Sequence, residues 1–135
     1  MNVLEQIYAK AKENPQKVAF PEASNEKMMQ AAYETGKEGY IIPVLVGEAE
    51  KLKELAEERG YDPSVFSFVD IHDETYTNDV IRRYVELPDT IFKEKAIGRR
   101  MQDPLYYAMA MQKVGDADVT FAGIDNTTGD VLLAG

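Results

Sequence analysis

The sequence contains no cysteine and a single histidine, His72. Without cysteine, neither a disulfide framework nor a thiol nucleophile is available. Zinc sites are built mainly from cysteine and histidine, so this composition argues against one. His72 follows a predicted strand among acidic residues, which leaves a general base, a metal ligand and a plain surface residue as its interpretations. We expect no metal centre.

The sequence also lacks any apolar run close to the roughly 20 residues that a membrane-spanning helix needs. Residues 1–8 contain an acidic side chain and have neither the basic segment nor the apolar core of a signal peptide. We therefore expect a cytoplasmic protein that does not associate with membranes.

Basic residues are fewer than acidic residues in this sequence. The chain has 15 lysines and arginines against 24 aspartates and glutamates, for a net charge of −9. Such a balance argues against nucleic acid as a partner, because phosphate backbones are bound by basic surfaces. Any anionic substrate must be held by local cations and backbone N–H groups against an unfavourable background field.

Short β-rich runs alternate with helical patterns along the 135 residues. The runs predict strands at residues 18–20, 41–46, 66–69 and 119–122. The alternation predicts a single α/β domain over residues 1–135, with a parallel sheet sandwiched between helices. Pro43, inside the second run, indicates an edge strand or a bulge.

Helical periodicity and capping residues place six helices between and around these strands. They are predicted at residues 2–14, 26–36, 48–59, 78–85, 91–101 and 104–114. We expect Ser24 or Asn25 to cap the second helix and Thr77 or Asn78 to cap the fourth. Pro104 stands at the favourable first position of the last helix.

The polar loop after the fourth strand is a candidate anion site. Asn126, Thr127, Thr128 and Gly129 lie between that strand and a helix that begins near Asp130. A helix N-terminus with free N–H groups and hydroxyls, at the carboxyl end of a strand, suits an anion. An ordinary capped helix explains the same residues, and both interpretations stay open.

A second group of polar residues follows the first strand. Glu22, Ser24 and Lys27 stand at the strand end and the start of the next helix, from which they could reach a substrate. The alternative is again a capped helix with solvated charges.

Several motifs occur in an order that resembles the phosphate acetyltransferase and phosphate butyryltransferase family. The most specific are a Gly-Asp-Ala-Asp turn at residues 115–118 and a Thr-Thr-x-Asp-x-Leu segment at residues 127–132. Three further segments also agree with the family: Val-Ala-Phe-Pro-Glu at 18–22, the apolar strand at 40–47 and the helix opening at 103–108. The resemblance covers the whole chain but only the N-terminal part of the family's usual length.

The resemblance implies an acyltransferase that converts an acyl-CoA and phosphate to an acyl phosphate and CoA. It implies a phosphotransacetylase-like fold, similar to the isocitrate and isopropylmalate dehydrogenases, and a chain that is the N-terminal portion of a longer two-domain enzyme, inactive alone. Coenzyme A would be a substrate, with no bound cofactor, and a homodimer is compatible with the family. The residues implied to bind substrate are Asn126, Thr127, Thr128 and Gly129, with Glu22, Ser24 and Lys27 as a secondary group.

An alternative function is a non-catalytic small-ligand or regulatory module on the same scaffold. Family members carry one arginine after a Tyr-x-Glu-Leu segment and another in Asp-x-Leu-Arg. Here Pro88 and Leu133 stand at those two positions. The arginines that could replace them are Arg82, Arg83, Arg99 and Arg100.

Overall fold

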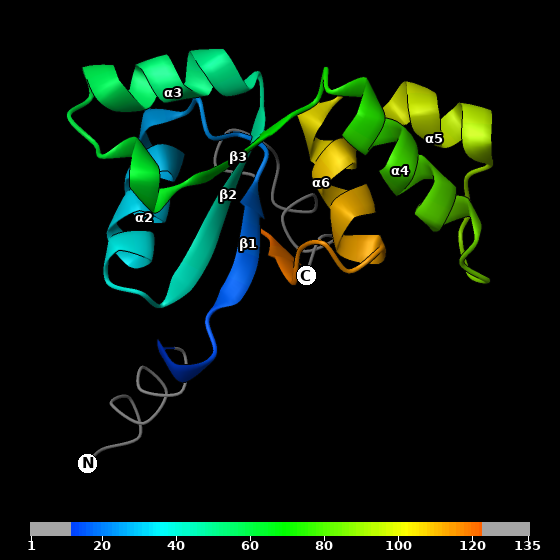
Figure 1. The fold of residues 1–135 in the computed structure, drawn as a ribbon, viewed down its shortest axis with the longest axis horizontal. Helices are drawn as coiled ribbons and strands as arrows, with labels where there is room; N and C mark the ends of the chain where they lie inside the picture. The colour runs from blue at the N-terminus through cyan, green and yellow to red at the C-terminus, as the bar shows by residue number, and fades with distance from the viewer. Residues whose placement is uncertain (1–11, 123–135) are drawn as a thin grey trace.

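A computed structural model describes residues 12–122 of the chain (Figure 1). Four parallel strands form one sheet in the order β3-β2-β1-β4. Their bounds are Gln16–Phe20 for β1, Ile41–Gly47 for β2, Ser67–Asp70 for β3 and Val119–Thr120 for β4. The predicted parallel α/β sheet is therefore confirmed, although β4 is shorter than the expected 119–122.

Helices connect and cover these strands. Along the chain they are α2 (Glu26–Lys37), α3 (Ala49–Glu58), the short 3-10 helix η1 (Pro63–Val65), α4 (Glu74–Val85), α5 (Glu94–Arg100) and α6 (Pro104–Lys113). Most of the helix predicted at residues 2–14 lies outside the described residues. None of the helices within residues 12–122 has the length and apolarity that a membrane crossing requires.

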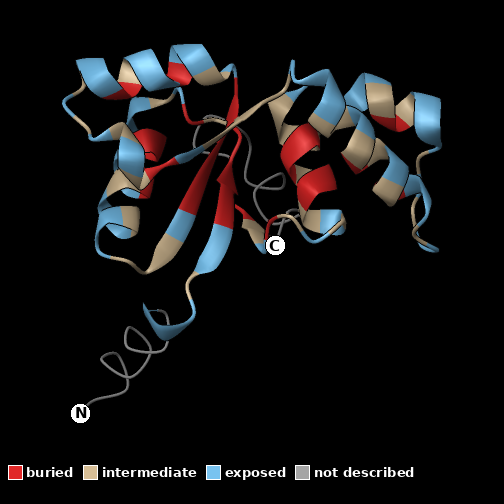
Figure 2. Cartoon of the chain, in the orientation of Figure 1, coloured by how far each residue is buried: buried red, intermediate tan, exposed pale blue. Residues whose placement is uncertain are grey.

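Strand side chains alternate between two apolar layers, as the pleat of a β-strand requires. Val18, Phe20 and Leu45 pack on α2 and α3 on one face. Val44 and Val46 pack on the opposite face, where α6 lies against the sheet, α4 packs on α6 and α5 packs on α4. Figure 2 shows the resulting buried stripe along the strands and on α6. Helices cover both faces, as the sequence predicted.

Pro43 corrects one sequence expectation. It lies in β2, which is a central strand with β3 on one side and β1 on the other. The sheet tolerates proline here because β2 begins to pair with β3 only at Val44, so Pro43 has a paired neighbour on the β1 side alone. Neither a sheet edge nor a bulge is needed.

Two helix starts differ from the sequence prediction. Helix α4 begins at Glu74, because Asp73 caps it through a 3.2 Å bond from the Tyr76 N–H to its carboxylate. Thr77, an expected cap, instead lies inside the helix, with its hydroxyl 2.8 Å from that of Tyr107. Helix α5 begins at Glu94 rather than at Ile91.

Other caps agree with the sequence. Asn25, one of two residues expected to cap α2, accepts hydrogen bonds from the N–H groups of Lys27 and Met28. Asp103 caps α6, and Pro104 is the first residue of that helix. Side-chain oxygens at these positions satisfy N–H groups that have no partner within the helix.

Candidate functional site

The strand order fixes where a ligand is best accommodated. The chain moves from β1 through β2 to β3 on one side and then returns to place β4 on the other side of β1. Open α/β sheets bind ligands outside the carboxyl ends of their strands, near such a reversal. The carboxyl edge of the sheet is therefore the candidate site, and the turns after β1, β2 and β3 form its described part.

A pocket of about 420 Å³ lies at this edge of the sheet. Its walls come from the turn after β1, the end of β2, the first turns of α3, the turn after β3 and the segment that leads into α6. The lining residues are Pro21, Ser24, Val46, Gly47, Glu48, Lys51, Leu52, Leu55, Ile71, His72, Gln102 and Pro104. The pocket thus has apolar walls and a few polar groups, as small-molecule sites commonly do.

The secondary site residues predicted after β1 divide into two groups. Ser24 lines the pocket, whereas Glu22 and Lys27 are not among its lining residues. The carbonyl oxygen of Ser24 accepts a 2.9 Å hydrogen bond from Nη2 of Arg59, just after α3. This bond ties the Ser24 turn to the far end of α3 and thereby fixes one wall of the pocket.

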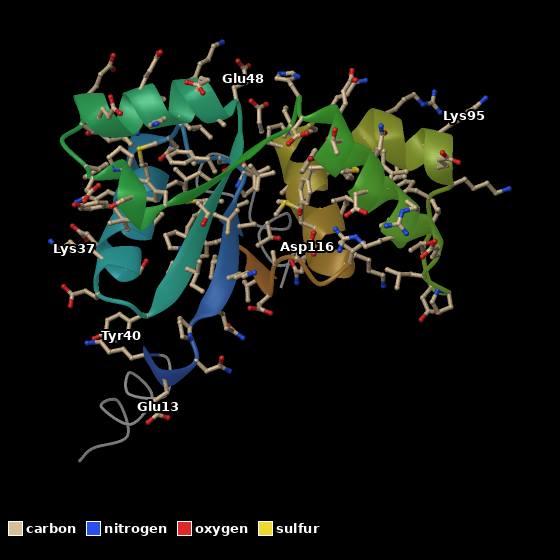
Figure 3. All side chains as sticks on the ribbon, viewed as in Figure 1. Glu13, Lys37, Tyr40, Glu48, Lys95 and Asp116 are labelled. Atoms are coloured by element: carbon tan, nitrogen blue, oxygen red, sulfur yellow. The ribbon has the colours of Figure 1, made fainter. Side chains whose placement is uncertain are left out.

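The charged groups of the pocket are Glu48 and Lys51, on the first turn of α3. Lys51 Nζ lies 2.9 Å from Glu48 Oε2. The hydrogen bond and the negative charge of Glu48 raise the pKa of Lys51 above its ordinary value. Both side chains are open to solvent, and Glu48 is labelled at the start of α3 in Figure 3.

His72 lies where the pocket meets a second hollow of about 540 Å³. That hollow is lined by Ile71, His72, Glu74, Thr77 and Asn78. The backbone N–H of His72 donates a 2.8 Å hydrogen bond to Asp70 Oδ1, and the side chain is exposed. Residues 12–122 contain no cluster of three or more side chains that could hold a metal ion, so His72 belongs to none in this range.

The loop predicted to hold the anion, Asn126 to Gly129, lies outside the described residues. Its approach is described, since β4 pairs with β1 through Val18–Val119 and Ala19–Thr120. The Phe121 N–H then donates a 2.8 Å bond to the Ala19 carbonyl oxygen. The chain therefore leaves the sheet next to the carboxyl end of β1, on the same edge as the pocket.

The sequence did not predict the role of the Gly-Asp-Ala-Asp turn. Asp116 accepts hydrogen bonds from Arg83 Nη1 at 2.8 Å, Arg83 Nη2 at 2.6 Å and the Tyr76 hydroxyl at 2.6 Å. Asp118 accepts a 2.9 Å bond from the Lys17 N–H, and its own N–H donates to the Lys17 carbonyl oxygen at 2.8 Å. The first aspartate, labelled in Figure 3, fixes the turn to α4, and the second fixes it to β1.

The arginines considered as substitutes for the missing family arginines have different surroundings. Arg83 is engaged with Asp116 and Asp79, and Arg82 with Asp79 and Glu86. Arg100 lies over the rings of Phe92 and Tyr106, at 5.2 and 5.3 Å from their centroids. Arg99 is exposed. None of the four lines the pocket.

Comparison with known proteins identifies the family. The family model described as "Phosphate acetyl/butaryl transferase" matches residues 2–135. The chain therefore belongs to the phosphate acetyl and butyryl transferases, as the motif order predicted.

Relatives and solved structures agree with this assignment. The chain is 32% identical to the phosphate acetyltransferase of Clostridium acetobutylicum over its whole length, which corresponds to 41% of that enzyme. It is 28% identical to the Acetivibrio thermocellus phosphate acetyltransferase, with 98% of this chain and 40% of that enzyme covered. The fold matches the crystal structure of a Streptococcus pyogenes phosphotransacetylase with a TM-score of 0.79 at 20% identity, covering 99% of this chain and 42% of that one.

The extent of these matches matters for function. The chain spans about two fifths of the length of the relatives it matches, and the matched part is their N-terminal portion.

Proposed function

We propose that this chain is the N-terminal domain of a two-domain phosphate acyltransferase, and that its carboxyl-edge pocket receives acyl-CoA. The observation that carries the proposal is the pocket's position. It lies at the strand ends where an α/β sheet binds ligands, in a chain that belongs to this family. Coenzyme A is a substrate of phosphate acetyltransferases, and none of their chemistry requires a metal.

The proposed reaction needs no nucleophilic side chain. An oxygen of inorganic phosphate attacks the thioester carbonyl, the tetrahedral intermediate collapses, and the thiolate of CoA leaves as the acyl phosphate forms. The oxyanion and the thiolate both require N–H donors or cations. We propose that Asn126, Thr127, Thr128 and Gly129, which follow β4, hold the phosphate, while Ser24 and Lys51 contact the acyl-CoA.

The alternative, a small-ligand or regulatory module without turnover, is favoured by a separate observation. By the resemblance, Pro88 stands where family members carry an arginine, and Arg82, Arg83 and Arg100 are engaged elsewhere. A module of this kind would bind CoA in the same pocket but would remain inactive in any longer assembly.

The 135-residue chain alone is expected to have negligible acyltransferase turnover. The reason is that it spans only about two fifths of the length of its relatives and that, by the resemblance, Pro88 and Leu133 stand where the family has arginines. The measurement is acyl-CoA formation from acetyl or butyryl phosphate and CoA. A rate in the ordinary enzyme range of about 1–1000 per second would contradict this expectation.

Coenzyme A is nevertheless expected to stabilise the chain, because the pocket is formed largely by the turn after β1, the end of β2 and the first turns of α3. If the dissociation constant is about 0.1 mM, then about 5 mM CoA adds roughly 2 kcal/mol to the free energy of unfolding. Thermal unfolding monitored by circular dichroism should then show a Tm higher by several degrees. An unchanged Tm at that concentration would contradict CoA binding by this chain.

A chimeric enzyme distinguishes the proposed acyltransferase from the non-catalytic module. Residues 2–135 would replace the matching part of the Clostridium acetobutylicum enzyme. Turnover by the chimera supports the acyltransferase. CoA binding without turnover in a folded chimera supports the module.

A further inference from the structure

One acidic and one strongly basic side chain line the pocket, and they bind each other. Among the twelve residues that line it, Glu48 is the anion and Lys51 the cation. Their side-chain atoms are 2.9 Å apart. The remaining walls are mostly apolar and come from Pro21, Val46, Leu52, Leu55, Ile71 and Pro104. The pocket therefore offers one cation to a ligand, and that cation already has an internal partner.

Lys51 can exchange Glu48 for a ligand anion at a small cost in free energy. The side chains of Lys51 and Glu48 are 72% and 49% exposed and are separated by one helical turn. Solvent-exposed pairs of this kind contribute little to stability, because water and salt screen them and two long side chains must be held still. A ligand anion with several oxygens competes well for such a lysine, because charge-assisted hydrogen bonds to phosphate are strong.

Within residues 12–122, the Glu48 carboxylate makes no bond besides the one to Lys51. Glu48 is the N-cap residue of α3, yet its side chain makes no capping hydrogen bond. The helix is supported there by the Glu48 backbone carbonyl, which accepts a 3.0 Å bond from the Leu52 N–H. The carboxylate can therefore be changed without removing a bond on which α3 depends.

We propose that Glu48 sets the ligand selectivity of this pocket by competing for Lys51. Lys51 binds the anionic group of an incoming ligand, and Glu48 must be displaced for that to happen. Apolar walls with a cation at one side suit a ligand that has an uncharged stem and an anionic end, such as coenzyme A. The choice of coenzyme A rests on the proposed function, whereas the competition between Glu48 and an anion does not.

Calorimetric titration of Glu48→Gln and Lys51→Met tests the proposal with three probes: coenzyme A, pantetheine and inorganic phosphate. Glu48→Gln should raise the affinity for coenzyme A about fivefold, since it removes both the competitor for Lys51 and a repulsive charge near the ligand. The same substitution should change the affinity for pantetheine, which has no charge, by less than about twofold. Lys51→Met should lower the affinity for coenzyme A about tenfold. In the double variant, adding Glu48→Gln to Lys51→Met should change this affinity little further.

The same helix supplies matched controls. Glu50→Gln and Lys53→Met make the same charge changes on exposed residues of α3 that do not line the pocket. Their effects on the affinity for coenzyme A should stay below about twofold, because residues two positions apart on a helix do not face each other and salt screens exposed charges. Unchanged thermal unfolding of each variant confirms that the fold is retained.

Each remaining outcome is decisive. If Glu48→Gln behaves as Glu50→Gln does, or Lys51→Met as Lys53→Met does, the proposal is overturned, while coenzyme A binding itself can still stand. A third outcome is that no variant binds coenzyme A, while phosphate binds Glu48→Gln but not the double variant. This would support the exchange of Glu48 for an anion at Lys51, and it would contradict acyl-CoA binding by the pocket. If no probe responds to either substitution, the exchange is overturned.

Discussion

Gly36→Ala is expected to lower the free energy of unfolding by about 2 kcal/mol. A Cβ atom at Gly36, near the end of α2, would lie 2.6 Å from Cγ and 2.9 Å from Cδ of Pro43, and 3.1 Å from Val65 Cγ1. The rigid ring of Pro43 is buried in β2 and cannot rotate away. Forcing an extra methyl group into a close-packed contact costs roughly 1–3 kcal/mol, which outweighs the helix preference of alanine.

Gly98→Ala in α5 is the matched control, and its effect should have the opposite sign. There the nearest atom to an added Cβ is Ile81 Cδ1 at 3.7 Å, an ordinary contact. The substitution should stabilise the chain by about 0.5 kcal/mol through helix propensity. Thermal or urea unfolding measures both variants. Equal shifts of the same sign would show that the contact between α2 and β2 does not limit this position.

Asp116→Asn is expected to lower the free energy of unfolding by about 2 kcal/mol, because two charge-assisted bonds to Arg83 and one from Tyr76 are weakened or lost. The side chains of Arg83 and Asp116 are only 30% and 27% exposed, so water replaces these bonds incompletely. Tyr76→Phe removes one bond and leaves the ion pair, and it should cost about 1 kcal/mol. A fully retained stability in Asp116→Asn would contradict a clamp between α4 and the turn.

The acid dependence of the same pair gives a second measurement. Hydrogen bonds from Arg83 hold the pKa of Asp116 below its ordinary value. The stabilisation is therefore present above the pKa of an unfolded aspartate, about 4, and is lost as the pH falls through the lower folded value. The difference in stability between the wild type and Asp116→Asn should be constant near neutrality and should shrink below about pH 4. A difference that grows on acidification would contradict this assignment.

The sheet could be predicted from the sequence because its signals are local and agree with one another. Residues 41–46 form a nearly continuous apolar run, which indicates a strand covered on both faces, and β2 is such a strand. Buried residues such as Met28, Met29 and Ala32 follow from helical periodicity in α2. Ser24 could be expected at the candidate pocket because strand ends share one edge of a parallel sheet.

Features that depend on distant residues could not be predicted. The Arg83–Asp116 pair joins residues 33 positions apart, and no local pattern distinguishes it from solvated charges. The cap of α4 is a local feature for which the expectation of Thr77 or Asn78 is wrong, because Asp73 is an equally suitable cap residue a few positions earlier. Lys51 stands in a highly charged stretch, where no local pattern distinguishes it from solvated charges. Only the turns after β1 and β3 and the segment before α6 place it in a pocket.

The position of β1 in the sheet has a consequence for biosynthesis. Its neighbour β2 follows within a few tens of residues, but its other neighbour arrives only with Asp118, 101 residues after Lys17. At synthesis rates of about 5–20 residues per second, one edge of β1 stays unpaired for roughly 5–20 seconds. An unpaired strand edge is a template for pairing with other chains. The interval in which a nascent chain is most prone to aggregate is therefore set by chain order, and strengthening the finished sheet would not shorten it.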